Sequence, residues 1–295
     1  MTMNKTWALV VLIAVVACGP RNQDGGSGGR TVIQNKGSDT LVNVAQAWAE
    51  QYKEINPNVA VAVTGGGSGT GISAMINGTV DIANASRKMK DKEIELAQGH
   101  GIEPVKWTVG YDALAVFVHP DNPADSFALE QLAEIYGEGG EVDTWDQLEI
   151  EIPGCDSNEI VRVSRQNNSG TYVYFKETVL GKRRDYKLGS RDMHGSKDVV
   201  DLVQNTPCAI GYSGLAYATH EVKMPCIEAN AGECIAPSVE TAIDRTYPIA
   251  RPLFMYTAGQ PTGAIKDYLD WILSDEGQCI IQSKGYAPVQ PADCG

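Results

Sequence analysis

The sequence has 295 residues, of which 43% are hydrophobic, and a formal net charge of −13 at pH 7. This length is long for a single hydrophobic core and suits two domains. The acidic balance argues against nucleic acid and against an anionic membrane face as partners, but it says little about the charge inside a buried site.

The N-terminus has the features of a bacterial export signal. Lys5 precedes an apolar stretch over residues 7–16, which is too short to span a bilayer but suits a signal peptide. The stretch ends in "VVAC", which looks like a lipobox, so we expect residues 1–17 to be removed and Cys18 to carry a lipid. An ordinary signal peptide cut elsewhere is the alternative. Residues 18–30 would then form a flexible tether.

Three strand-to-helix turns follow in chain order. Residues 31–40 predict a short strand and a polar turn with Ser38 or Asp39 at the N-cap position, and residues 41–55 carry apolar side chains at helical spacing. The run "VAVAV" (59–63) predicts a second strand, "ISAMING" (72–78) a short helix, and "TVDIANASR" (79–87) another strand and turn. Farther along, residues 160–163 predict a strand, residues 165–170 a polar turn, and Thr171 the start of a helix.

Each of these turns carries small hydroxyl residues, and together they indicate an anion site. Helix starts expose unpaired backbone N–H groups and partial positive charge. One such turn is weak evidence, because serine and threonine are common caps. Three turns, with two arginines in adjacent turns, predict an oxyanion site at the carboxyl ends of the strands. The residues are Ser38 and Thr40, Ser68 and Thr70, Ser169 and Thr171, with Arg87 and Arg165.

The loop "GGGSGTG" (65–71) matches no nucleotide motif. No frame has the spacing G-x-G-x-x-G, and Ile72 stands where a P-loop requires lysine. A nucleophile elbow is broken by Thr70, and the G-x-S-x-G match at residues 25–29 falls in the tether with no strand before it. The alternatives are a plain flexible turn and a loop whose bare backbone approaches an anion.

Six cysteines remain after Cys18, an even number that suggests disulfides outside the cytoplasm. Six cysteines allow 15 connectivities. Among them we favour Cys226–Cys234, Cys279–Cys294 and Cys155–Cys208. Because there is no C-x-x-C and the four histidines are far apart in sequence, we expect no metal site. We likewise expect no cofactor and no catalytic residues.

Six segments together resemble a known family, the phosphate-binding proteins of bacterial phosphate ABC importers within the periplasmic-binding-protein class. They occur in this order: "GSDTLVNVAQAW" (37–48), "GGGSGTGISAMINGTVDIANASR" (65–87), "SRQNNSGT" (164–171), "AIGYSGLAYA" (209–218), "YPIARPLFMYT" (247–257) and "LSDEGQCIIQSKGYAPV" (273–289).

The resemblance implies an α/β fold of periplasmic-binding-protein type II, with two lobes and an anion in the cleft between them. The chain would cross between the lobes near residues 109–117 and 247–252. Lobe I would comprise residues 31–112 and 248–295, and lobe II residues 113–247. The helix-like segment 265–273 has only a packing role in this prediction.

Carried over residue by residue, the family's anion contacts fall on Ser38, Asp39, Thr40, Ser68, Arg87, Arg165, Ser169, Gly170 and Thr171. Two positions depart from many relatives. Many have Asp in place of Arg87, where it accepts the proton of phosphate, and many have Asp in place of Asn167, where it pairs with the arginine. Other branches of the family carry "SR" at the first position.

Arginine only donates hydrogen bonds, so another group must accept the proton that distinguishes phosphate from sulfate. We hypothesise that Asp39 accepts it, while Arg87 and Arg165 balance the added charge. The alternative role for Asp39 is a helix N-cap that points away from the ligand.

The leading hypothesis is thus a monomeric extracytoplasmic lipoprotein that captures inorganic phosphate and delivers it to an ABC permease, closing its lobes by a hinge motion. Alternatives are a binder of arsenate, sulfate, molybdate or tungstate, and a phosphate sensor or surface protein without transport. A phosphatase or phosphotransferase is disfavoured, because no Asp/His cluster and no serine with an evident base are visible.

Overall fold

The computed structural model describes residues 30–228 and 232–295. The predicted signal peptide, Cys18 and most of the tether lie outside the described residues. Within the two described ranges, no helix is both long and apolar enough to cross a bilayer.

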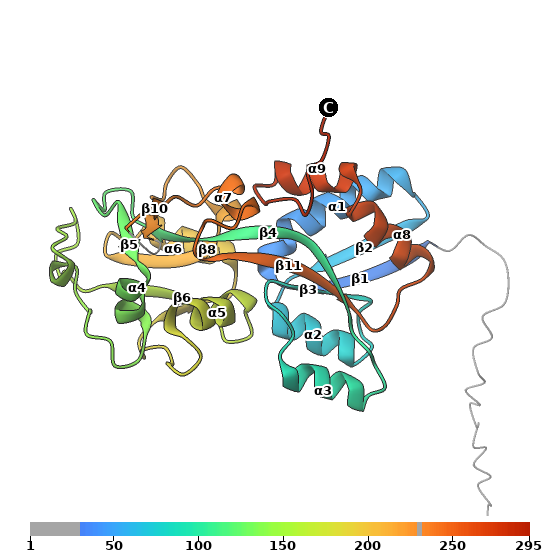
Figure 1. Cartoon of the computed structure of the whole chain (residues 1–295), viewed down its shortest axis with the longest axis horizontal. Coiled ribbons are helices and arrows are strands. Elements are labelled where there is room, and N and C mark those ends of the chain that lie inside the picture. Colours follow the sequence, from blue (N-terminus) through green and yellow to red (C-terminus); the bar gives the residue numbers. More distant parts are fainter. Residues whose placement is uncertain (1–29, 229–231) are drawn as a thin grey trace, which may run out of the picture.

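The described chain forms two α/β lobes that lie side by side (Figure 1). Lobe I comprises β1 (Thr31–Gly37), α1 (Val42–Ile55), β2 (Val59–Thr64), α2 (Ser68–Ile76), β3 (Ile82–Ala85), α3 (Asp91–Gly99), α8 (Gly263–Ile272) and α9 (Asp275–Ser283). Lobe II comprises β5 (Ser126–Ala128), α4 (Leu129–Tyr136), β6 (Val161–Arg165), α5 (Gly170–Phe175), β7 (Arg191–Met193), α6 (Ser196–Gln204), β8 (Ala209–Gly214), β9 (Cys226–Glu228), β10 (Cys234–Ile235) and α7 (Val239–Ile243).

Two long strands, β4 (Val105–Val118) and β11 (Ala250–Thr257), run from one lobe into the other. They are antiparallel neighbours and join the lobes' strands into one eight-stranded sheet of order β2-β1-β3-β11-β4-β8-β6-β7. Along β4, Val109 belongs to a lobe I core and Ala113 to a lobe II core. Leu253 of β11 packs in lobe I, and Ile249, just before that strand, packs in lobe II.

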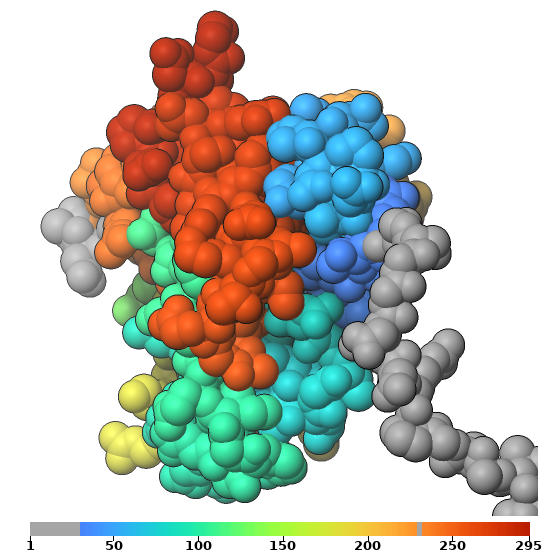
Figure 2. Space-filling model, turned by 90° about the vertical axis from the view of Figure 1, so that its right-hand side faces the viewer, coloured from blue at the N-terminus to red at the C-terminus, as the bar shows by residue number. Residues whose placement is uncertain are grey.

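The helix predicted after the first turn is α1, and its apolar spacing produces its buried face. Val44, Ala45, Trp48 and Tyr52 are buried, whereas Ile55 at the C-terminal end is 47% exposed. The Trp48 Nε1 donates to Gly277 O at 2.7 Å, which fastens the C-terminal α9 onto the N-terminal α1. Figure 2 shows the orange-red residues late in the chain beside the blue residues that follow the start of β1.

Helix α2 begins at Ser68, four residues earlier than its apolar pattern predicts, so half of the glycine-rich segment is helical. Gly67, which precedes the helix, has a φ of +90°, a conformation that favours glycine. A Cβ at Gly71 would lie 2.4 Å from Lys36 O. The glycines therefore let the first turn of α2 pack directly against β1.

Three disulfides link Cys155 to Cys208, Cys226 to Cys234, and Cys279 to Cys294. These are the pairs favoured from the sequence. The first joins two segments of lobe II that are 53 residues apart, and the other two close short loops.

Candidate functional site

The three strand-to-helix turns meet where the two lobes touch, and most of their hydroxyl residues are buried. The turns after β1 and β2 come from lobe I, and the turn after β6 comes from lobe II. Five of the hydroxyl residues are at most 2% exposed, namely Ser38, Thr40, Ser68, Ser169 and Thr171, and Thr70 is partly buried. Burying so many polar groups is costly unless they are hydrogen-bonded to one another or to a ligand.

Only one of the three turns uses its serine as a conventional cap. Ser169 Oγ accepts from the backbone N–H of Thr171 at 3.1 Å. Ser38 makes no cap hydrogen bond, and the N-cap of α2 is Gly67 rather than Ser68. At these two helix starts the hydroxyls are therefore not needed for capping.

The hydroxyls of lobe I form a cluster that includes a serine not predicted from the sequence. Ser38 Oγ donates to Ser86 Oγ at 2.9 Å, and the backbone N–H of Ser86 donates to Ser68 Oγ at 3.0 Å. Gly170 of lobe II lies so close that a Cβ on it would be 2.3 Å from Ser68 Oγ. The start of α5 in lobe II is therefore in close contact with this cluster.

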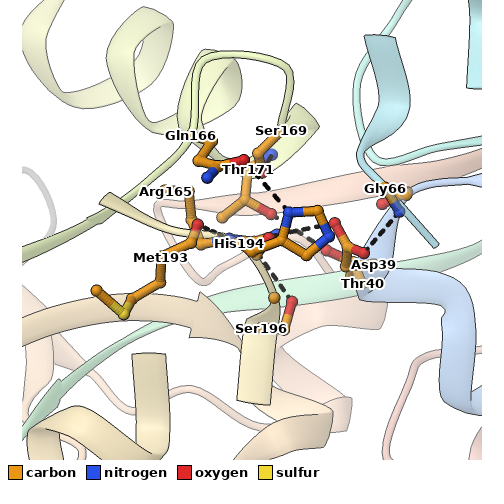
Figure 3. Close-up of polar contacts among 12 residues, drawn as sticks. Asp39, Thr40, Gly66, Arg165, Gln166, Ser169, Thr171, Met193, His194 and Ser196 are labelled. Atoms are coloured by element: carbon orange, nitrogen blue, oxygen red, sulfur yellow. Dashed lines mark hydrogen bonds and ion pairs between the residues drawn. The ribbon is translucent and has the colours of Figure 1, made fainter. Parts of the chain in front are cut away.

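Arg165 of lobe II lies beside Asp39 of lobe I (Figure 3). It is the last residue of β6 and is 1% exposed. Its guanidinium donates to Asp39 Oδ2 at 3.0 Å, to His194 O at 2.7 Å and to Ser196 Oγ at 3.0 Å. Burial lowers the pKa of Arg165, and the Asp39 carboxylate opposes that change. The arginine is held rigidly, with a carboxylate from the other lobe beside it.

Asp39 contacts both lobes through its carboxylate. One carboxylate oxygen pairs with Arg165, and Oδ1 accepts from the backbone N–H of Gly66 at 2.9 Å. It therefore bridges the glycine loop of lobe I to the arginine of lobe II. This pairing resembles the one expected in relatives between an aspartate at position 167 and the arginine.

The glycine loop also contacts lobe II through its backbone. Gly69 N donates to Asn168 O at 3.0 Å, and Asn168 Nδ2 donates to Gly66 O at 3.0 Å and to Thr70 Oγ1 at 3.3 Å. A Cβ at Gly67 would lie 2.7 Å from Asn168 O. Glycine at this position thus permits close contact between the lobes, as well as the turn itself.

Arg87 lies apart from the hydroxyl cluster. Both of its terminal nitrogens donate to the carboxylate of Glu93 at 2.7 Å. Ser86, the residue before Arg87 in the turn after β3, is the one that joins the cluster. The signal that could have identified Ser86 is a hydroxyl residue directly after a strand, the same pattern as in the three predicted turns.

Arg87 instead lines a groove of about 900 Å³ between the lobes, together with Asn167. The other cations in its lining are Lys88, Lys90, Lys176 and Lys182, and its carboxylates are Asp91 and Glu177. The groove is therefore locally basic within an acidic protein, which favours the approach of anions.

A third buried arginine, Arg251 of β11, was also missed from the sequence. Its Nε and one terminal nitrogen donate to Asp112 Oδ2 of β4 at 3.0 and 2.7 Å, and neither side chain has any exposed area. Its other contacts are Thr171 Oγ1 at 3.0 Å and Thr40 Oγ1 at 3.1 Å. Burial raises the pKa of Asp112, and the charge of Arg251 opposes this. No pattern in the sequence pairs residues 139 positions apart.

No metal centre accompanies this arrangement in the part of the chain that the structure describes, where no three His, Cys, Asp or Glu side chains gather suitably. The functional groups that meet at this site are mainly hydrogen-bond donors. Hydroxyls, helix-start N–H groups and arginine converge from both lobes, as a buried oxyanion requires.

The chain is similar in sequence to known binding proteins. A family model described as a PBP superfamily domain matches residues 22–276. The phosphate-binding protein PstS of Pseudomonas aeruginosa is 34% identical over 270 residues, covering 87% of this chain and 83% of that protein. Protein SphX of Synechococcus elongatus is 32% identical over 295 residues, covering 96% and 85% respectively.

Solved structures resemble the chain over most of its length. A putative phosphate ABC transporter substrate-binding protein from Clostridium perfringens, solved with bound phosphate, is 28% identical with a TM-score of 0.78 and covers 88% of this chain and 100% of that one. An ABC-type phosphate transport receptor from Vibrio cholerae is 25% identical with a TM-score of 0.67, with the same coverage.

Proposed function

Because the chain belongs to the PBP superfamily, and within it to the family of PstS phosphate-binding proteins, we propose that it binds inorganic phosphate between its lobes and delivers it to an ABC permease. The observation that carries this proposal is the buried Arg165 amid hydroxyl residues of three helix starts, two from one lobe and one from the other. A planar guanidinium suits two oxygens of a tetrahedral anion.

The proposed contacts come from both lobes. Ser38, Thr40 and Ser68 supply donors from lobe I, and Arg165, Ser169, Gly170 and Thr171 supply them from lobe II. Ser86 joins this set through its hydrogen bonds to Ser38 and Ser68. Arg87 is assigned to the mouth of the site, because it lines the basic groove that we propose as the access route for the anion.

Asp39 is proposed to serve phosphate selectivity in the bound state. Each of its oxygens has one contact, with Arg165 or with Gly66 N, and a carboxylate oxygen accepts more than one hydrogen bond. It therefore retains capacity to accept the proton that phosphate carries and sulfate lacks. Its pairing with Arg165 gives it a second task, which is to hold the arginine in place.

The lobes are proposed to close about the two crossing strands, with lobe I at residues 31–112 and 248–295 and lobe II at 113–247. Closure is favoured by contacts that exist only when the lobes meet, such as Gly69 N to Asn168 O. An extracytoplasmic location is proposed from the signal-like N-terminus, with a lipid on Cys18 and the glycine-rich tether keeping a monomeric binding protein near the permease.

The experiment that tests the function is calorimetric titration of ligand-stripped protein with phosphate, arsenate, sulfate and molybdate. Tight binding of phosphate with much weaker binding of sulfate and molybdate is expected. A preference for molybdate or sulfate would replace phosphate with that oxyanion. Hydrolysis of a phosphomonoester by the purified protein would favour an enzyme instead.

A further inference from the structure

Arg251 is the one guanidinium among the described residues that contacts the hydroxyls of both Thr40 and Thr171. It lies on β11, directly opposite Asp112 of β4 in the register of the two strands that join the lobes. Thr40 precedes α1 of lobe I, and Thr171 lies in the first turn of α5 of lobe II. A single side chain on the connecting strands therefore holds one helix start of each lobe.

The direction of these hydrogen bonds has a chemical consequence. An arginine nitrogen only donates, so both threonine oxygens act as acceptors toward Arg251. The two oxygens are also 3.1 Å apart, and at most one hydroxyl proton is used between them. At least one threonine proton is then left to donate elsewhere, which is the polarity that an anion requires.

We propose that Arg251 is a positioning residue for anion binding: by donating to the Thr40 and Thr171 oxygens it leaves at least one of their hydroxyl protons to donate to the ligand, and it ties the two lobes together in the closed state. This inference rests on the proposed function and extends it to a residue outside the predicted contact set. Asp112 holds the guanidinium from the opposite side, with two hydrogen bonds to one oxygen.

Stability alone gives little reason to bury this ion pair. The cost of desolvating two charges often exceeds their attraction, and well-packed apolar residues commonly replace such pairs without loss. A lysine at position 251 would retain a charge for Asp112. It lacks the planar fork that reaches a carboxylate and two hydroxyls at once.

The test compares phosphate affinity and dissociation rate in the wild-type protein, Arg251→Lys, Thr40→Val and the double variant. Arg251→Lys is expected to weaken phosphate binding at least about tenfold, mainly through faster dissociation. Thr40→Val should cost clearly less in the lysine background than alone, because the lysine no longer orients that hydroxyl. Arg245→Lys is the matched control, since Arg245 is exposed and bonds to Tyr111 Oη at 2.9 Å beside the same strands. It should bind as wild type does.

Normal phosphate affinity in folded Arg251→Lys would overturn the proposal. Strictly additive losses of affinity in the Arg251→Lys/Thr40→Val variant would do so too. If Arg251→Lys does not fold, the neutral pair Asp112→Asn/Arg251→Gln keeps similar shape and removes both charges. Wild-type phosphate affinity in the Asp112→Asn/Arg251→Gln variant would also overturn the proposal. Failure of the wild-type protein to bind phosphate would instead refute the proposed function, and this inference with it.

Discussion

Replacing Arg165 with alanine should sharply weaken phosphate binding. The side chain is 1% exposed and makes an ion pair with Asp39 as well as hydrogen bonds to His194 O and Ser196 Oγ. Truncating one partner of a buried, hydrogen-bonded charge pair costs about 2–5 kcal/mol. The lower end applies here, because the Asp39 side chain is 12% exposed and water partly replaces its partner. Even that lower end corresponds to about a 30-fold loss of affinity.

The assay is calorimetric titration with phosphate, after circular dichroism has shown that each variant is folded. Arg162→Ala is the matched control on the same strand, because Arg162 pairs with an Asp143 that is 59% exposed and surface pairs contribute little. Arg165→Lys tests the planar fork separately, since it keeps the charge but not the bidentate geometry. A folded Arg165→Ala protein that titrates almost normally would remove this arginine from the site.

Three further predictions concern selectivity, closure and stability. Asp39→Asn should reduce the phosphate-to-sulfate affinity ratio at least about tenfold, or roughly 1.4 kcal/mol; an unchanged ratio in titrations with both anions would leave Asp39 only as the partner of Arg165. Gly170→Ala should weaken phosphate binding at least about tenfold, with little change in melting temperature. The reason is that its Cβ would lie 2.3 and 2.5 Å from two serine oxygens of the other lobe. Unaltered phosphate affinity would mean that the lobes need not close this tightly. Replacing both Cys155 and Cys208 by serine should lower the free energy of unfolding, measured with denaturant, by about 2–4 kcal/mol. The oxidised wild-type protein should show no free thiol, and two or more free thiols would contradict the pairing.

Much of the local structure follows from neighbouring residues, and the sequence predicts it well. The apolar spacing in residues 41–55 predicts α1, the run at 59–63 predicts β2, and Ser169 caps α5 as its position suggests. These features depend on the period of side chains along a helix or strand and on the chemistry of helix starts. The concentration of hydroxyls in three such turns likewise requires no tertiary information.

The pairing of side chains across the lobes could not be predicted in the same way. Asp39 contacts Arg165, which is 126 residues away, and Arg251 reaches Thr40 across 211 residues. Whether Ser86 or Arg87 joins the hydroxyl cluster depends on which of the two folding brings against Ser38 and Ser68. The sequence determined that this protein carries helix starts suited to an anion, because those are properties of short segments. Only the tertiary structure decided which charges meet there, because ion pairs form between groups that folding brings together, whatever their separation along the chain.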